Sequence, residues 1–210
     1  MFQRRNSEPK GSKRHSGTHT ESTRQLKWPH IKSLRNSPEF PATSTMHTQA
    51  LVALQPGSGF TLEEIELDDL RPDECLVQLV ATGICHTDLK SSSGGSIVKF
   101  PVVLGHEGST SSCLDLTAGA GIVKRVGSDV KRVAEGDKVL LSFNSCGKCR
   151  SCSVGAPAYC KHCLALNFGG TRLDGTHTAS IGGKPLYANF FGQSSLSRHS
   201  VVSERSVILS

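Results

Sequence analysis

The 210-residue sequence lacks long apolar runs, because no stretch approaches the roughly 18 consecutive apolar residues that a membrane helix needs. No apolar segment of the signal-peptide type follows Met1. Aromatic residues make up only 5%, and Trp28 is the single tryptophan, which disfavours a stacking surface for nucleic-acid bases. We therefore expect a protein that neither spans a membrane nor is secreted, and we predict a cytoplasmic location.

The formal net charge of +6 comes entirely from one end of the sequence. Residues 1–45 contain nine Lys and Arg against three Asp and Glu, whereas residues 46–210 contain fifteen of each. A nucleic-acid-binding domain normally carries a basic patch. We therefore expect no nucleic-acid partner for residues 46–210.

Residues 1–45 are rich in Ser, Thr, Lys, Arg, His and Pro, with few apolar residues. Such a segment buries too little apolar surface to offset the entropy lost on ordering, so we predict a disordered basic tail. Three roles stay open. The first is an extension with no folded role, because Met46 offers a second start. The second is a transit peptide that directs the protein to mitochondria, and the third is a basic arm that adheres to an acidic partner.

Short apolar segments separated by Gly and Pro turns dominate the rest of the sequence. They predict strands over residues 46–54, 60–67, 75–81, 122–126 and 138–143, and a last β region over residues 188–202. Residues 86–92 predict one short helix. We therefore predict a single, mainly β domain with short helices over residues 46–210, folded as a compact, partly open barrel.

Four cysteines lie close together in the segment SFNSCGKCRSCSVGAPAYC, namely Cys146, Cys149, Cys152 and Cys160. Four thiolates within fifteen residues, separated by small and turn-forming residues, can enclose one tetrahedral zinc ion. Disulfides of a secreted domain, the paired knuckles of a nucleic-acid-binding zinc ribbon, and four unrelated thiols all fit this spacing less well. We predict a structural zinc lobe over residues 144–163, and Cys163 beside it has no assigned role.

Two further segments carry potential metal ligands, Gly83-Ile84-Cys85-His86-Thr87-Asp88 and Gly105-His106-Glu107-Gly108. Each is weak evidence alone, because a single Cys or His is more often structural. Together with the downstream cysteines, and in this order, they resemble the zinc-dependent medium-chain alcohol dehydrogenases over about residues 46–207. The similar part is the N-terminal GroES-like catalytic domain, and the sequence FFGQSS resembles the aryl-alcohol dehydrogenases.

The resemblance implies a catalytic zinc ion held by Cys85 and His106, with an open position for substrate. At that position a primary or aryl alcohol would bind as its alkoxide and lose a hydride to NAD, giving the aldehyde. Small alcohols and aldehydes are thus the expected partners.

The resemblance also implies roles for four neighbouring residues. Thr87 would pass the alcohol proton into a relay, Asp88 would orient the His106 ring, and Glu107 would lie behind the metal. His86 takes a position where the family has a basic residue near the pyrophosphate of the cofactor. Asp88 and Glu107 have an ordinary alternative as solvated carboxylates.

One departure from the family interrupts its pattern G-H-E-G-A-G-x-V. Eleven residues, 109–119, here separate Gly108 from Ala120. Because they show no turn or strand pattern of their own, we hypothesise an insertion of translated non-coding sequence. Cys113 lies within this segment and has no assigned role.

Two other departures concern the metal and the cofactor. The third catalytic zinc ligand of the family lies downstream of this domain, and no cysteine follows Cys163. The sequence also has no G-x-G-x-x-G fingerprint, so we expect the NAD-binding Rossmann domain to be absent. Glu107 would then be the nearest substitute ligand, and we predict a fragment that does not oxidise alcohols alone.

Two alternatives stay open from the sequence. One is a non-enzymatic zinc-binding module stabilised by the four-cysteine lobe. The other is a fragment of a polyol or sorbitol dehydrogenase, because the same lobe occurs there. The oligomeric state of the family does not transfer, since its members associate largely through the cofactor domain.

Overall fold

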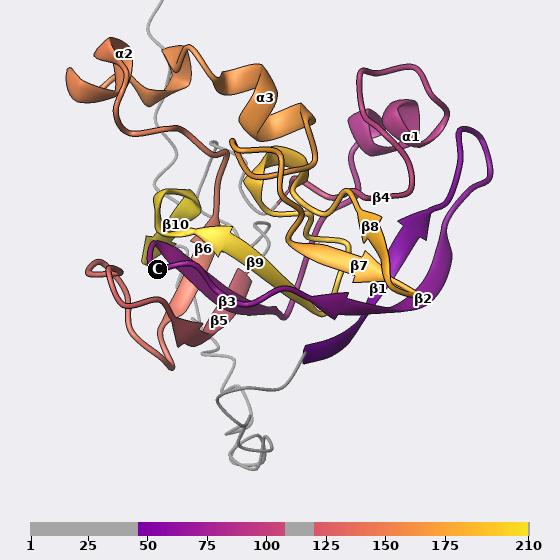
Figure 1. Ribbon diagram of the computed structural model, residues 1–210, viewed down its shortest axis with the longest axis horizontal. Coiled ribbons are helices and arrows are strands. Elements are labelled where there is room, and N and C mark those ends of the chain that lie inside the picture. The colour runs from indigo at the N-terminus through magenta and orange to yellow at the C-terminus, as the bar shows by residue number, and fades with distance from the viewer. Residues whose placement is uncertain (1–45, 108–119, 210) are drawn as a thin grey trace, which may run out of the picture. The chain divides into compact units, whose positions relative to one another are not determined.

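The computed structural model describes residues 46–107 and 120–209 (Figure 1). By its internal contacts the chain divides into Met1–Pro41 and Ala42–Ser210, and every described residue belongs to the second unit. The tail predicted over residues 1–45, the insertion predicted over residues 109–119, and Cys113 lie outside the described residues. These predictions therefore stay predictions.

Ten strands in the described residues form two five-stranded antiparallel sheets. The strands are β1 (Met46–Ala53), β2 (Thr61–Leu67), β3 (Glu74–Leu79), β4 (Val102–Val103), β5 (Ala120–Val126), β6 (Lys138–Leu141), β7 (Ala179–Ile181), β8 (Lys184–Leu186), β9 (His199–Ser203) and β10 (Val207–Leu209). One sheet has the order β4-β1-β2-β7-β8 and the other β10-β6-β5-β3-β9. The segment just before β9 connects the two sheets, because the Leu51 N–H of β1 donates to the Leu196 carbonyl at 2.8 Å. This architecture is the predicted mainly β, partly open barrel.

Alternating side chains explain why the strands form where they do. In β1, Met46, Thr48 and Ala50 are buried, whereas His47 and Gln49 are exposed. Successive side chains of a strand point to opposite faces, so this period of two buries one face of the sheet. The buried faces form two core clusters, and the largest fully buried side chains of the bigger one are Val52, Ile65, Leu76, Val102, Val103, Leu104, Leu186 and Phe190.

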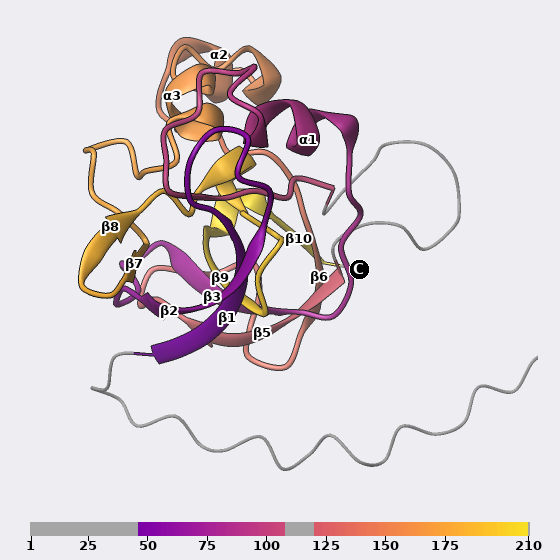
Figure 2. The same cartoon turned by 90° about the vertical axis from the view of Figure 1, so that its right-hand side faces the viewer.

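The helices are short and lie at one end of the strands, as Figures 1 and 2 both show. Helix α1 (His86–Ser92) lies between β3 and β4 in the chain. Three further helical segments lie between β6 and β7, namely α2 (Arg150–Ser153), η1 (Pro157–Tyr159) and α3 (Cys163–Phe168), and two short 3-10 helices, η2 (Phe190–Gly192) and η3 (Glu204–Ser206), lie nearer the end of the chain. The segments α2, η1 and α3 belong to a lobe that carries the cysteine cluster. None of the helices in the described residues has the length and apolar character needed to cross a bilayer.

The last β region, predicted over residues 188–202, is present only in part. Only its last residues join β9, and the chain instead forms a short 3-10 helix, η2 (Phe190–Gly192). Phe191 and Ser194 take left-handed conformations, with φ of 50° and 44°, which break an extended strand. The sequence pattern also missed the short elements α2, α3, β4, β7, β8 and β10. Segments of two to six residues are too short to show a reliable period.

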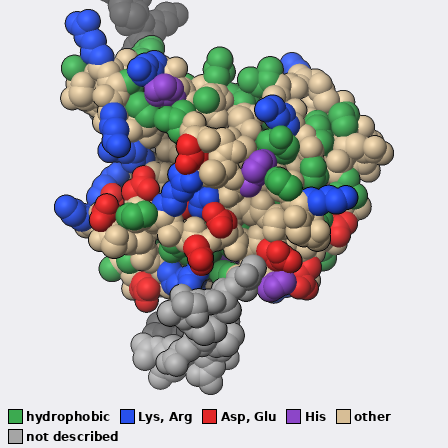
Figure 3. Space-filling view, in the orientation of Figure 1, with side chains coloured by type: hydrophobic (Ala, Val, Ile, Leu, Met, Phe, Trp, Pro, Cys, Tyr) green, Lys and Arg blue, Asp and Glu red, His purple; other side chains and the backbone are tan. Residues whose placement is uncertain are grey.

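Acidic and basic side chains are interspersed on the face drawn in Figure 3. This mixture agrees with the balanced charge of residues 46–210.

Candidate functional site

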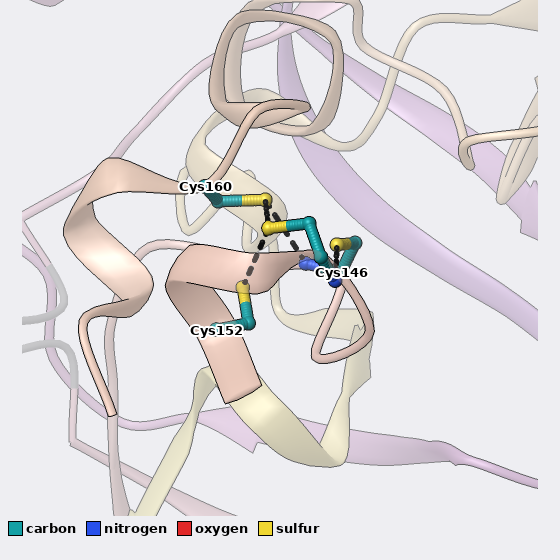
Figure 4. A group of neighbouring side chains, drawn as sticks. Cys146, Cys152 and Cys160 are labelled. Atoms are coloured by element: carbon teal, nitrogen blue, oxygen red, sulfur yellow. Dashed lines mark hydrogen bonds between the residues drawn. The ribbon is translucent and has the colours of Figure 1, made fainter. Parts of the chain in front are cut away.

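The cysteine cage consists of Cys146, Cys149, Cys152 and Cys160, whose sulfur atoms all lie within 4.8 Å of one another (Figure 4). The Cys149 Sγ is 3.5 Å from that of Cys152 and 4.0 Å from that of Cys160. In a tetrahedral site with Zn–S distances of about 2.3 Å, neighbouring sulfurs are about 3.8 Å apart. The cage therefore has the spacing and the donor chemistry that one zinc ion requires.

Backbone N–H groups point at the cage sulfurs. The Cys149 N–H donates to the Cys146 Sγ, and the N–H groups of Cys146 and His162 donate to the Cys160 Sγ, each at 3.4 Å. The backbone hydrogen bond from Cys152 is the largest cause that lowers the pKa of Cys149 to about 6. Burial raises the pKa of Cys152 to about 11. The backbone hydrogen bonds thus favour the thiolate form of Cys149, which is the form that binds zinc.

Two features hold the chain around the cage in place. Asn167 of α3 accepts the Asn144 N–H at 2.8 Å, and its amide donates to the Asn144 carbonyl at 3.0 Å. Gly147 has a φ of 67°, and the guanidinium group of Arg205 occupies the space that a Cβ there would fill. The positive φ favours glycine at this turn of the lobe, whatever position the Arg205 side chain takes.

The second cluster, called the open set here, consists of Cys85, His106 and Glu107. One donor atom from each lies within 4.8 Å of the others. Cys85 stands at the N-cap of α1, where its Sγ accepts the Thr87 N–H at 3.5 Å. The Asp88 carboxylate accepts the Cys85 N–H at 3.0 Å, which completes a capping box. The local sequence of α1 therefore fixes Cys85 before any metal binds.

Asp88 links α1 to the segment that carries His106. Its side chain is fully buried, and its Oδ1 accepts the Gly105 N–H at 2.9 Å and lies 3.0 Å from the His106 Nδ1. Burial opposes both charges, but the hydrogen bonds outweigh it, so the pKa of Asp88 is lowered and that of His106 is raised. Because Nδ1 is engaged by Asp88, Nε2 is the His106 atom left for a metal.

The Glu107 carboxylate reaches the open set by passing close to the backbone of Gly83. The Gly83 N–H donates to the Glu107 carbonyl at 3.4 Å. A Cβ at position 83 would collide with the Oε2 atom of Glu107. The missing side chain at Gly83 therefore leaves the space in which the Glu107 carboxylate lies.

An apolar cavity of about 260 Å³ opens beside His106. Its lining includes three phenylalanines, Phe143, Phe168 and Phe191, together with Cys163. The sequence analysis did not assign these residues, although the unusual FFGQSS segment contains one of them. Phe168 and Cys163 reach the cavity because α3 lies over it, and no sequence pattern predicted that helix.

A larger cavity of about 840 Å³ lies away from the open set, between the cage lobe and the strands. Charged side chains in its lining pair with one another. Arg172 donates to the Glu74 carboxylate at 2.7 and 2.9 Å and to Asp68 at 2.6 Å, and Arg71 donates to Asp174 at 2.7 Å. These ion pairs form a structural network along one side of the cavity.

Two further predicted residues lie on α1. The Thr87 hydroxyl is 3.6 Å from the Cys85 Sγ, so it borders the open set. His86 is exposed on the same helix. The structure thus brings Cys85, Thr87, Asp88, His106 and Glu107 together, and it separates them from the cage cysteines as two donor sets. The functional roles given to these residues stay predictions.

The open set also fits zinc by its donor chemistry. A thiolate, an imidazole nitrogen and a carboxylate oxygen are all common zinc ligands, and catalytic sites use three such protein ligands with one open position. Around a tetrahedral zinc ion, any two of these donor atoms would be about 3.4–3.6 Å apart. The three donor atoms lie close enough to reach these distances through side-chain rotation.

Comparison with known proteins gives the family. A model described as the alcohol dehydrogenase GroES-like domain matches residues 71–208, which include both donor sets. The geraniol dehydrogenase of Castellaniella defragrans is 41% identical over 157 residues, covering 74% of this chain and 39% of that protein.

Solved structures agree with this match. An alcohol dehydrogenase zinc-binding domain protein from Burkholderia ambifaria is 41% identical, with a TM-score of 0.71 over 79% of this chain and 42% of its own. The benzyl alcohol dehydrogenase of Acinetobacter calcoaceticus is 34% identical, with a TM-score of 0.68 over 79% of this chain and 41% of its own. The chain spans about two fifths of the length of these relatives. It belongs to the zinc-dependent alcohol dehydrogenase family and holds the GroES-like domain of that family.

Proposed function

We propose that this chain supplies the metal-binding and substrate-binding domain of an alcohol dehydrogenase that converts a primary alcohol to its aldehyde. The observation that carries this proposal is the open set, Cys85, His106 and Glu107, beside an apolar cavity that His106 itself lines. Catalytic zinc sites combine this kind of donor set with a free coordination position that faces a substrate pocket.

Each residue of the open set has a defined task in this proposal. Cys85, His106 and Glu107 would hold the zinc ion, which supplies a positive charge that favours the deprotonated form of the alcohol. Asp88 holds His106 through Nδ1 at 3.0 Å and leaves Nε2 for the metal. The Thr87 hydroxyl, which borders Cys85, would accept the proton from the alcohol oxygen while it passes its own proton on to solvent.

Oxidation of an alcohol removes one proton from the oxygen and one hydride from the adjacent carbon. NAD would supply the hydride acceptor, and the exposed His86 on α1 would face its pyrophosphate. All strand pairs in residues 46–107 and 120–209 are antiparallel, so these ranges contain no parallel dinucleotide-binding sheet. We therefore propose that the chain alone binds metal and alcohol but does not transfer the hydride.

The cavity favours an alcohol with an unsaturated or aromatic hydrocarbon group. Phe143, Phe168 and Phe191 offer ring faces without hydrogen-bonding groups, whereas the polar side chains of Ser142, Asn167 and Gln193 take up a smaller part of the lining. A polyol would bury several hydroxyl groups there, and each unpaired hydroxyl costs about 1–3 kcal/mol. The names of two relatives, geraniol dehydrogenase and benzyl alcohol dehydrogenase, agree with the apolar alternative.

Zinc content and alcohol binding test the proposal on the full chain. We expect two zinc ions per chain by elemental analysis, and one in Cys85→Ser, whereas Cys163→Ser keeps both because Cys163 is in neither donor set. Calorimetry should detect binding of benzyl alcohol but not of sorbitol, and the Cys85→Ser variant should lose it.

Three outcomes would contradict parts of this proposal. One zinc ion in the unmodified chain would favour the non-enzymatic module instead. Binding of sorbitol in preference to benzyl alcohol would favour a polyol dehydrogenase. Reduction of NAD⁺ by the zinc-loaded chain with benzyl alcohol would show that the chain needs no further domain.

A further inference from the structure

A strained turn packs against the open set. Phe191 has φ of 50° and ψ of 29°, a left-handed conformation that few residues other than glycine adopt. Ser194 of the same turn has φ of 44°. Strained backbone of this kind persists only where the surroundings hold it, and it concentrates at functional sites.

The strained residue places its ring on His106. The Phe191 and His106 ring centroids are 4.7 Å apart with an interplanar angle of 28°, so the two rings are stacked. Phe190 meets the same imidazole edge-on, at 5.6 Å and 85°. The imidazole is therefore held on one face by Phe191, at an edge by Phe190, and at Nδ1 by Asp88.

Hydrogen bonds join this turn to the residues just before His106. The Ser194 Oγ donates to the Val103 carbonyl at 2.7 Å, and the Ser195 N–H donates to the Gly105 carbonyl at 3.0 Å. Within the turn, the Phe190 N–H donates to the Ser194 Oγ at 2.8 Å. The turn and the His106 segment thus form one hydrogen-bonded unit, and this unit holds Phe191 in its strained conformation.

We propose that Phe191 is a positioning residue, which fixes the plane of the His106 ring and so directs its Nε2 atom toward the metal. A ring held only through Nδ1 can still tilt about that hydrogen bond. The stacked phenyl group removes this freedom before the metal arrives, so less conformational entropy is lost on binding. This inference rests on the proposed function, because it assumes that His106 is a metal ligand.

Cadmium NMR on the full chain tests the inference without measuring activity. A ¹¹³Cd ion bound by four sulfurs resonates apart from one bound by sulfur, nitrogen and oxygen, so the cage and the open set report separately. In Phe191→Leu we expect about tenfold weaker metal affinity at the open set, as for other residues that orient a ligand. Its resonance should also shift or broaden, whereas the cage resonance stays unchanged.

Two further variants distinguish a positioning role of Phe191 from a general contribution to core packing. Phe191→Tyr keeps the stacked ring and should restore the affinity to within about twofold. Phe60→Leu removes a ring that packs on the same core but lies at the start of β2, so it should leave the open set unchanged. If Phe191→Leu does not fold, Phe191→Gly replaces it, because glycine relieves the left-handed backbone while it removes the ring.

The possible failures are distinguishable. If the unmodified chain shows only the cage resonance, the proposed function is wrong and this inference falls with it. If the open set binds cadmium but Phe191→Leu matches the unmodified chain in affinity and shift, only the positioning role is wrong. An equal loss in Phe60→Leu would likewise overturn it, since packing alone would explain the effect.

Discussion

The two donor sets of this chain are built in opposite ways. The cage takes four identical donors from one short segment, residues 146–160, and backbone N–H groups surround its sulfurs. The open set takes three different donors from two segments that meet only in the folded chain, and the buried side chain of Asp88 joins them. A set with uniform donors thus arises from local sequence, whereas the mixed set depends on tertiary packing.

The surroundings of the two sets differ as well. The buried cluster of the cage lobe consists of Cys149, Cys160 and Leu166, so the ligands themselves form most of its core. The open set borders the main core, where Val102, Val103 and Leu104 are fully buried just before His106. We therefore expect the lobe to need its metal in order to fold, and the open set to keep its shape without one.

The largest expected effect is the loss of the cage metal. Structural zinc in small peptides contributes about 10–16 kcal/mol of apparent binding energy, which here would be lost in Cys149→Ser. We expect one zinc ion fewer per chain and rapid hydrogen exchange across residues 144–168, with slow exchange kept in β1, β3 and β5. Cys163→Ser is the matched control in the same lobe. A lobe that stays protected in Cys149→Ser would contradict the comparison.

The next largest effect is a loss in the free energy of unfolding of the zinc-bound chain when a buried ion pair is broken. Arg172 is buried and pairs with Glu74 and Asp68, so Arg172→Met leaves a buried carboxylate without its partner. We expect a loss of about 3–5 kcal/mol in the free energy of unfolding by urea, without loss of zinc. Arg71→Met breaks an ion pair whose side chains are 38% and 51% exposed, and should cost less than about 1 kcal/mol. Equal losses in the two variants would refute this account.

A smaller effect should be confined to the open set. Asp88→Asn keeps the shape of the side chain but removes the charge that orients His106, so metal affinity there should fall about 10- to 100-fold. Competition with a chromophoric chelator measures both sites, and the cage affinity should not change. Asp69→Asn, at an exposed carboxylate, serves as the control. A matching loss at the cage would mean that the two sets are not independent.

The smallest effect is a pH window in the metal-free chain. Folding raises the pKa of His106 above 6.5 and lowers that of Asp88 below 3.8. The pair therefore contributes its full stabilisation of the folded state between about pH 4 and 6.5. This stabilisation is lost as pH rises through the folded pKa of His106, and also as pH falls through the folded pKa of Asp88. A double-mutant cycle of Asp88→Asn and His106→Gln should give about 1 kcal/mol inside this window. A coupling energy that does not vary with pH would contradict the assignment.

The sequence predicted those parts of the molecule that local patterns encode. Helix α1 begins and ends at the predicted residues, His86 and Ser92, because its cap and its polar face are local. The strands β1 to β3 were found within one or two residues at most ends, since their apolar alternation is long enough to show a period. The family resemblance is confirmed. It drew attention to the residues of the open set, whereas the cysteine spacing alone indicated the cage.

The rest depends on contacts between distant segments, which no single stretch reveals. The turn at Phe191 interrupts a predicted β region because hydrogen bonds to Val103 and Gly105 hold it in a left-handed conformation. The three phenylalanines of the cavity come from the segment after β6, from α3 and from this turn, so they share no sequence pattern.

Gly83 carries a practical consequence for the redesign of this site. The carboxylate of Glu107 lies where a side chain at position 83 would stand. Enlarging that residue by a single methyl group would push the third donor away while Cys85 and His106 stay in place. Substitutions at position 83 therefore offer a way to change the number of protein donors around a bound cation while Cys85, His106 and Glu107 themselves stay unchanged.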